Sequence, residues 1–212
     1  MSFKATHNSY HLPDRPDVQI DRYDVWEIEL DFGVGYDSPD FVVGHDCPEP
    51  KHGLYSLGDW VRCALDADSL TKHPLILKLE AKTHELCGQL RFPSFKCVDD
   101  WGVDWQARLA DSLTVWIGHD RWVTPTVYRE ELEGEWPEVA QLAGRVIVTL
   151  QDSNDDKDID STDSRFFGRD IPGLTAAWPP IDDESSYRKS LAAGVNRLIM
   201  DGGYRETWSL DQ

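Results

Sequence analysis

Carboxylates occupy alternate positions in one strand-forming stretch of the chain. In the segment 25–31 (VWEIELD), Glu27, Glu29 and Asp31 fall on one face of a strand, and the apolar residues between them fall on the other. Ionised carboxylates are costly to bury unless cations or hydrogen-bond donors face them. The spacing therefore predicts a row of acidic groups directed at a cationic partner.

A second stretch, at 75–82 (LILKLEAK), has the same alternation. Lys78, Glu80 and Lys82 share one face, and the other face carries Leu75, Leu77, Leu79 and Ala81. We expect Glu80, flanked by two cations, to face the same region as the first acidic row.

Two histidines stand where strand-forming stretches end. His7 and Asn8 close the first stretch, and His45 lies in the Gly-His-Asp sequence at 44–46 that closes the third. Polar groups near the carboxyl ends of barrel strands are candidate site residues. We therefore expect both histidines and the amide of Asn8 to open on the same rim as the carboxylates.

These residue types suit metal-assisted phosphoryl transfer. The oxygens of Asn8, Glu29, Asp31 and Glu80 form a donor set that a hard cation such as calcium prefers. Histidines outside that set, with an ordinary pKa of about 6.5, can transfer protons near neutral pH. Taken singly, each residue has a structural explanation, such as a hydrogen-bonded histidine or a charged edge strand. Their joint occurrence at four strand ends favours a site.

Apolar runs of strand length alternate with segments of helical character, which predicts an α/β chain. The expected strands are Phe3–Asn8, Val25–Asp31, Phe41–His45, Leu75–Lys82, Leu113–Ile117, Arg145–Gln151 and Asn196–Asp201, with Thr124–Tyr128 as a weaker eighth. The expected helices are Ser56–Ala67, Asp104–Ser112, Trp136–Ala143 and Ser185–Ala193, with Ser56 and Asp104 as N-caps and Gly144 and Gly194 as stops. This series predicts a distorted or shortened TIM-type (β/α) barrel, and 1–212 as one catalytic domain.

Composition narrows the possible partners. The 212 residues include 39 Asp and Glu against 21 Lys and Arg, a net charge of −18, which disfavours a nucleic-acid binder or a domain held on anionic lipid by charge. We expect a monomer with at most transient contact with a membrane surface. No apolar run approaches the ~20 residues of a membrane span, and no signal peptide precedes the first segment, so the chain as written is expected in the cytoplasm, or outside the cell if its N-terminus was trimmed.

The four cysteines form no CxxC pair and are expected to be structural thiols. In an exported chain, two of them would be a candidate disulfide. The cysteines are Cys47, Cys63, Cys87 and Cys97, of which the last two form that candidate pair.

Four segments in order resemble the calcium-dependent, phosphoinositide-specific phospholipase C family, and its bacterial-type branch most of all. They are KATHNSYH at 4–11, WEIELDF at 26–32, VGHD at 43–46 and LILKLEAK at 75–82. Later segments extend the resemblance over nearly the whole chain: WVTPTVY at 122–128, WPEVAQLAGRVIVTLQD at 136–152 and GVNRLIMDG at 194–202. The resemblance implies a distorted TIM-type barrel and a role in lipid metabolism.

The resemblance also implies roles for individual residues. His7 would stabilise charge on the phosphoryl group, and His45 would protonate the leaving oxygen. Glu29, as a calcium ligand, would also deprotonate the attacking hydroxyl. The implied calcium ligands are Asn8, Glu29, Asp31 and Glu80. The substrate-binding candidates are Lys78 and Lys82, from strand geometry, with Arg197 and Asp201.

By resemblance, the inositol 2-hydroxyl attacks phosphorus and gives a cyclic inositol phosphate. Two alternatives stay open. A glycerophosphodiester phosphodiesterase acting on a soluble phosphodiester also uses two histidines and three carboxylates, but that family opens with His-Arg-Gly where this chain has His7, Asn8 and Ser9. A catalytically idle barrel that binds calcium or an inositol phosphate would have no reason to keep both histidines.

Overall fold

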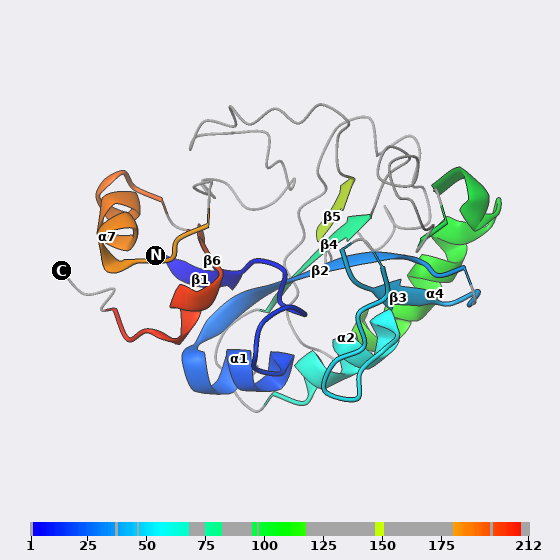
Figure 1. Cartoon of the computed structure of the whole chain (residues 1–212), viewed down its shortest axis with the longest axis horizontal. Coiled ribbons are helices and arrows are strands. Elements are labelled where there is room, and N and C mark those ends of the chain that lie inside the picture. The colour runs from blue at the N-terminus through cyan, green and yellow to red at the C-terminus, as the bar shows by residue number, and fades with distance from the viewer. Residues whose placement is uncertain are drawn as a thin grey trace.

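The computed structural model describes residues 2–36, 38–45, 47–67, 75–81, 95–96, 98–117, 147–150, 180–195 and 197–208. Within them, six strands form one sheet with helices against it (Figure 1). The strands are β1 (Phe3–Thr6), β2 (Val25–Val34), β3 (Phe41–Val43), β4 (Ile76–Ala81), β5 (Ile147–Leu150) and β6 (Arg197–Met200). The α-helices are α1 (Pro16–Tyr23), α2 (Leu57–Leu65), α4 (Trp105–Ile117) and α7 (Glu184–Ala192), and the 3₁₀ helices are η2 (Val98–Trp101) and η3 (Gly202–Arg205).

The strand order is β5-β4-β2-β1-β6, and every neighbouring pair along it is parallel. The first strand therefore pairs with both the second and the last of the described strands. Parallel strands place their carboxyl ends on one edge of the sheet, so the residues that follow β1 and β6 lie beside the late residues of β2 and β4. The predicted α/β class is confirmed. The described strands do not by themselves close a barrel.

The two faces of the sheet differ in chemistry. On one face, Ile28 and Leu30 of β2 lie opposite Leu77 and Leu79 of β4, all fully buried in the main hydrophobic core. Helices α1, α2 and α4 lie on one side of these strands in Figure 1 and contribute side chains to that core. The alternate residues of the same strands form the other face, which we call the charged face. It carries the acidic residues of β2 and β4.

Local sequence signals account for the ends of the helices. The predicted N-cap Ser56 accepts a hydrogen bond from the Asp59 backbone, and the Asp59 side chain accepts one in return, which forms a capping box at α2. The helix predicted at 185–193 is α7, capped by Asp183. Gly194 follows it with a φ of +82°, a conformation that glycine adopts without steric cost.

Two sequence predictions are wrong and one element was missed. The residues 113–117, predicted as a strand, form the last turn and a half of α4, because Leu109 and Leu113 lie one helical turn apart and are both fully buried. Helix α1 was not predicted, although Pro16 at its first position is a favoured helix start. The strand β3 is antiparallel to β2, whereas a (β/α) series requires a parallel strand.

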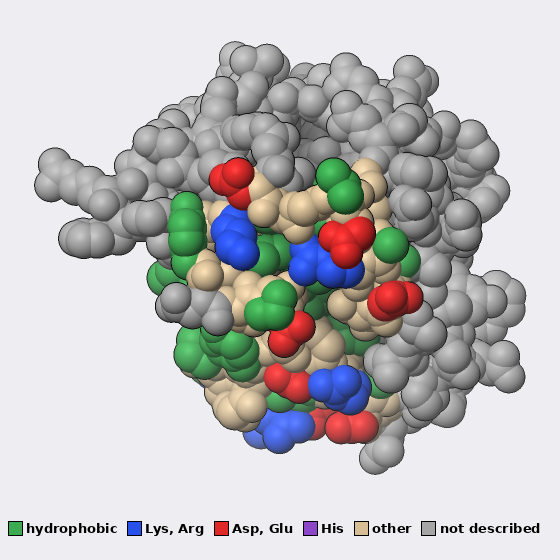
Figure 2. All heavy atoms as spheres, turned by 90° about the vertical axis from the view of Figure 1, so that its right-hand side faces the viewer, with side chains coloured by type: hydrophobic (Ala, Val, Ile, Leu, Met, Phe, Trp, Pro, Cys, Tyr) green, Lys and Arg blue, Asp and Glu red, His purple; other side chains and the backbone are tan. Residues whose placement is uncertain are grey.

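Parts of the prediction lie outside the described residues. These are the strand at 124–128, the helix at 136–143, Cys87 and Cys97. Cys47 and Cys63 are both present as thiols. None of the described helices is long and apolar enough to cross a membrane. On the face of the molecule shown in Figure 2, described acidic and basic side chains are interspersed with apolar ones.

Candidate metal and catalytic site

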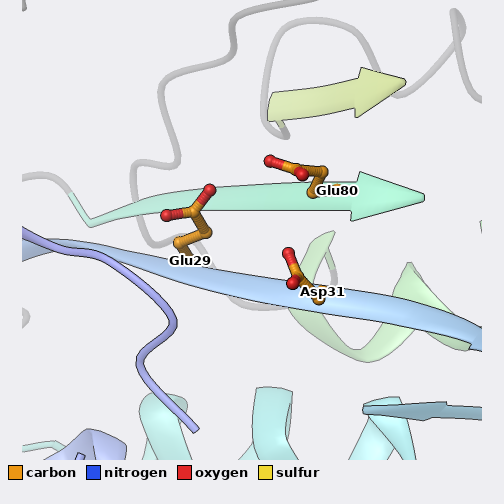
Figure 3. Close-up of side chains that lie close together, drawn as sticks. All are labelled: Glu29, Asp31 and Glu80. Atoms are coloured by element: carbon orange, nitrogen blue, oxygen red, sulfur yellow. The ribbon is translucent and has the colours of Figure 1, made fainter. Parts of the chain in front are cut away.

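Three carboxylates lie together on the charged face of the sheet (Figure 3). The register of β2 and β4 sets Glu29 opposite Lys78 and Asp31 opposite Glu80. One oxygen from each of Glu29, Asp31 and Glu80 lies within 4.8 Å of the oxygens of the other two. Glu29 and Asp31 are buried, and the side chain of Glu80 is 14% exposed. Two neighbouring strands thus bring together the carboxylates that the sequence pattern singled out.

This group of oxygens fits one divalent cation. Oxygens that bind calcium at roughly 2.3 to 2.6 Å are at most about 5 Å apart, and the three carboxylates meet that limit. The charge balance points the same way. Among the described residues, the four carboxylates of β2 and β4 are grouped with the cations Lys78 and Arg197. A bound divalent ion would offset negative charge in this group.

Lys78 lies inside the acidic group. Its ammonium donates a hydrogen bond to Glu29 and lies 3.6 Å from Oε2 of Glu80. Burial by itself would raise the pKa of Glu29, but the charges of Lys78 and His7 and the hydrogen bond from Lys78 lower that pKa to about 2. Burial opposes the charge on Lys78, yet Glu29 and Glu80 raise its pKa. Both groups are therefore ionised at neutral pH.

A second ion pair lies deeper on the charged face. The guanidinium of Arg197 binds both carboxylate oxygens of Glu27, with a distance of 2.7 Å between Nε and Oε2, and both side chains are only 2% exposed. Arg197 therefore neutralises the charge of Glu27, the first carboxylate of the acidic row. Glu27 accepts from Nε and Nη2 of the guanidinium, and the predicted contact between Arg197 and substrate stays a prediction.

His7 and Asp201 meet where β1 and β6 end. The backbone N–H of His7 donates to the carbonyl of Met200, which continues the pairing of the two strands by one residue. The ring Nδ1 of His7 lies 2.9 Å from Oδ1 of Asp201. A carboxylate at Nδ1 fixes the tautomer and the orientation of the ring and directs Nε2 away. Asp201, predicted to bind substrate, is placed as the partner of His7.

Asn8 makes the chain turn out of β1. Its φ of +46° lies in the left-handed region that asparagine tolerates better than most residues, and its carbonyl accepts a hydrogen bond from the N–H of His11. The hydroxyl of Tyr10 lies 2.7 Å from Oδ2 of Asp31 and 3.1 Å from Oδ1 of Asn8. Burial, the charge of Asp31 and the hydrogen bond to it raise the pKa of Tyr10 well above its usual range, so the hydroxyl keeps its proton.

A network of buried hydrogen bonds stabilises this turn. The Ser9 hydroxyl accepts a hydrogen bond from the Glu29 backbone and lies 2.7 Å from the hydroxyl of Thr6. Gln19 of α1, which is fully buried, accepts a hydrogen bond from Thr6 and donates one to the carbonyl of Ser9. The network therefore fixes the segment that carries His7 and Asn8 against β2 and α1.

His45 follows β3 on the same edge of the sheet. Although β3 is antiparallel, it ends beside the acidic group, because the N–H of Gly44 donates to the carbonyl of Asp31 at 3.1 Å. A Cβ at position 44 would lie 1.9 Å from the carbonyl oxygen three residues later, so only glycine fits. Glu49 accepts a hydrogen bond from the His45 backbone N–H and pairs with the ring of His11, which links the two histidine-bearing loops.

One predicted site residue, Lys82, lies outside the described residues. Sequence analysis missed three contributions to this region: the hydroxyl of Tyr10, the pairing of Glu27 with Arg197, and the pairing of His7 with Asp201. The alternation in β2 predicts that Glu27 lies on the charged face, where a buried carboxylate needs a cationic partner. Nothing in the sequence identified which cation that would be.

No protein-family model matches the chain, and no curated protein matches it. Among solved structures, the chain is similar to a calcium-dependent phosphoinositol-specific phospholipase C from a Gram-negative bacterium, Pseudomonas sp. That structure is the apo form of the enzyme in complex with myo-inositol. The identity is 13%, the match covers 96% of this chain and 89% of the other, and the TM-score is 0.44. Another crystal form of that enzyme matches at 20% identity over 72% of this chain and 56% of the other, with a TM-score of 0.31.

Proposed function

We propose that this protein is a calcium-dependent phosphodiesterase of the phospholipase C type, which cleaves phosphoinositide-like substrates through a cyclic inositol phosphate. One observation carries the proposal: a histidine oriented by a carboxylate and a three-carboxylate group with room for one divalent cation lie at the same edge of one sheet. Phosphodiester cleavage needs both proton transfer and compensation of negative charge at phosphorus, and this combination provides for both.

The proposed metal ligands are Glu29, Asp31 and Glu80, with the amide oxygen of Asn8 as a fourth. All are oxygen donors, as calcium requires. Calcium held there would lower the pKa of the attacking hydroxyl and offset negative charge that develops on the phosphoryl group.

The proton transfers fall to side chains of this chain. We assign Glu29 as the base that takes the proton of the inositol 2-hydroxyl, because it is ionised at neutral pH and calcium bound to that hydroxyl would lower the hydroxyl's pKa. His7, held at Nδ1 by Asp201, directs Nε2 at a phosphoryl oxygen. His45, which follows β3, protonates the leaving oxygen. Lys78 and Lys82 are proposed to bind phosphate oxygens once the carboxylates are neutralised.

A barrel is the architecture that we propose for the whole domain. The described parallel strands follow a circular order, with the last strand beside the first and the second strand on the other side of it. An open doubly wound sheet reverses its order at a switch point, whereas a barrel does not. We also propose a monomer that touches a membrane surface only while it turns over lipid.

The test is phosphorus NMR of the purified protein with phosphatidylinositol and, separately, with glycerophosphoinositol, each with calcium and with chelator. A calcium-dependent cyclic inositol phosphate signal is the expected result, and the substrate that gives it separates a lipid from a soluble phosphodiester. Hydrolysis to glycerol phosphate without a cyclic product would favour a glycerophosphodiesterase. No turnover of either substrate, with calcium bound, would refute catalysis on these substrates and favour the idle barrel.

A further inference from the structure

The hydroxyl of Tyr10 touches two of the proposed metal ligands. It donates to Oδ2 of Asp31 at 2.7 Å and lies 3.1 Å from Oδ1 of Asn8. These ligands come from different elements: Asp31 belongs to β2, and Asn8 lies in the turn that follows β1. Tyr10 is thus a direct link between two segments that must approach each other if both are to bind one ion.

The two contacts limit how far the two ligand oxygens can separate. With the hydroxyl between them, Oδ2 of Asp31 and Oδ1 of Asn8 are no more than about 5.8 Å apart, which is close to the separation of about 5 Å that two calcium ligands allow. Because a hydroxyl has one proton, the carboxylate takes it as the charged and nearer acceptor. The amide oxygen of Asn8 then keeps its lone pairs for another partner.

The ring of Tyr10 cannot shift to release these contacts. The residue is fully buried, and its ring packs edge-on against Trp60 of α2, with 6.5 Å between the ring centroids, and against His11 at 4.4 Å. Since close-packed aromatic side chains occupy one rotamer, the hydroxyl holds a fixed position beneath the acidic group. Groups held in this way orient metal ligands before the ion arrives.

We propose that Tyr10 is a positioning residue of the metal site, which sets calcium affinity by holding Asp31, through its hydrogen bond, beside Asn8 in the geometry that binds the ion. The proposal rests on the proposed function, because it takes calcium as the ligand of the acidic group. It assigns Tyr10 no contact with substrate and no part in proton transfer.

The test compares Tyr10→Phe with Tyr204→Phe by calorimetric titration of the metal-free proteins with calcium. Tyr204 is also fully buried, and its hydroxyl donates to Oδ2 of Asp14 at 2.6 Å, away from the acidic group. The two variants therefore lose the same hydroxyl and the same kind of hydrogen bond. We expect Tyr10→Phe to weaken calcium binding by about 10- to 100-fold, as loss of an orienting hydrogen bond does, and Tyr204→Phe to leave it unchanged.

Turnover provides a second measurement. In Tyr10→Phe, saturating calcium should restore turnover close to that of the unmodified protein, because the catalytic groups are intact. Unchanged calcium affinity in a folded Tyr10→Phe protein would overturn the proposal, as would a loss of turnover that calcium does not restore. If the unmodified protein itself binds no calcium, the proposed function fails first, and that result is recognisable without any variant.

Discussion

Replacing Lys78 by methionine should make the protein bind calcium more tightly. The ammonium of Lys78 is hydrogen-bonded to Glu29 and lies 3.6 Å from Oε2 of Glu80, so it contacts oxygens that an ion held by both carboxylates would also bind. Metal and ammonium compete for the same oxygens. Methionine keeps the length of the side chain and removes its charge.

The size of the expected change in calcium affinity follows from the distances between the charges. An ion that shares these oxygens would lie about 5 Å from the ammonium, where a divalent and a single positive charge repel by roughly 7 kcal/mol at an effective dielectric constant near 20. The flexible stem of lysine relieves most of this repulsion by turning the ammonium towards water. If about 2 kcal/mol remains, affinity in Lys78→Met rises by roughly 30-fold. Without metal, the same variant loses stability, because Glu29 and Glu80 lose a buried counter-ion.

The measurement is calorimetric titration of the metal-free proteins with calcium, joined to thermal unfolding with and without the ion. Lys189→Met is the matched control, because it removes the same charge from an exposed position on α7. We expect a tighter dissociation constant and a larger calcium-induced rise in Tm for Lys78→Met than for the control. Weaker calcium binding in a folded Lys78→Met protein would refute the competition, and would mean that Lys78 holds the carboxylates in place.

Three further predictions address the same site. His7→Ala and His45→Ala should each lower turnover by about 10²-fold or more, the loss expected for an acid or base, while the exposed His52→Asn keeps its activity; near-normal turnover in either alanine variant contradicts the assigned role. Glu80→Gln should raise the calcium concentration needed for half-maximal activity more than it lowers Tm, and an unchanged calcium titration removes Glu80 from the ligands. Because the pKa of Glu29 falls from 4.5 to about 2 on folding, its charge contributes about 3 kcal/mol that is present above pH 4.5 and lost as pH falls towards 2; chemical unfolding across this range should show a shallower loss in Glu29→Gln.

The alternation of apolar and charged residues carried most of the correct prediction. In β2 and β4, a period of two separated the core residues from Glu29, Asp31 and Glu80, and the parallel register then brought those carboxylates together. The sequence of each strand specifies this register, because a shift of one residue would move every side chain to the other face of the sheet. The parts of the site on these two strands could therefore be predicted.

What the sequence could not provide depends on contacts between distant segments. Leu113 has β-forming neighbours in 114–117, but it packs one helical turn from Leu109, and tertiary burial decides between the two structures. The antiparallel course of β3 follows from the loop that precedes it, for which the apolar pattern has no signal. Likewise, the pairing of Arg197 with Glu27 joins residues 170 positions apart, and no local rule selects such partners.

The pairing of β1 with β6 affects when the site can form. His7 and Asp201 are separated by 194 positions, and the strands that carry them are neighbours in the sheet. A chain that emerges from the ribosome in order has His7 from the beginning, but it lacks the carboxylate that orients this ring until almost all of the described strands have been made. Closing so long a loop is among the slowest steps of folding. The acidic row of β2 can thus pair with β4 before β6 has been made, whereas the pairing of His7 with Asp201 has to wait for β6.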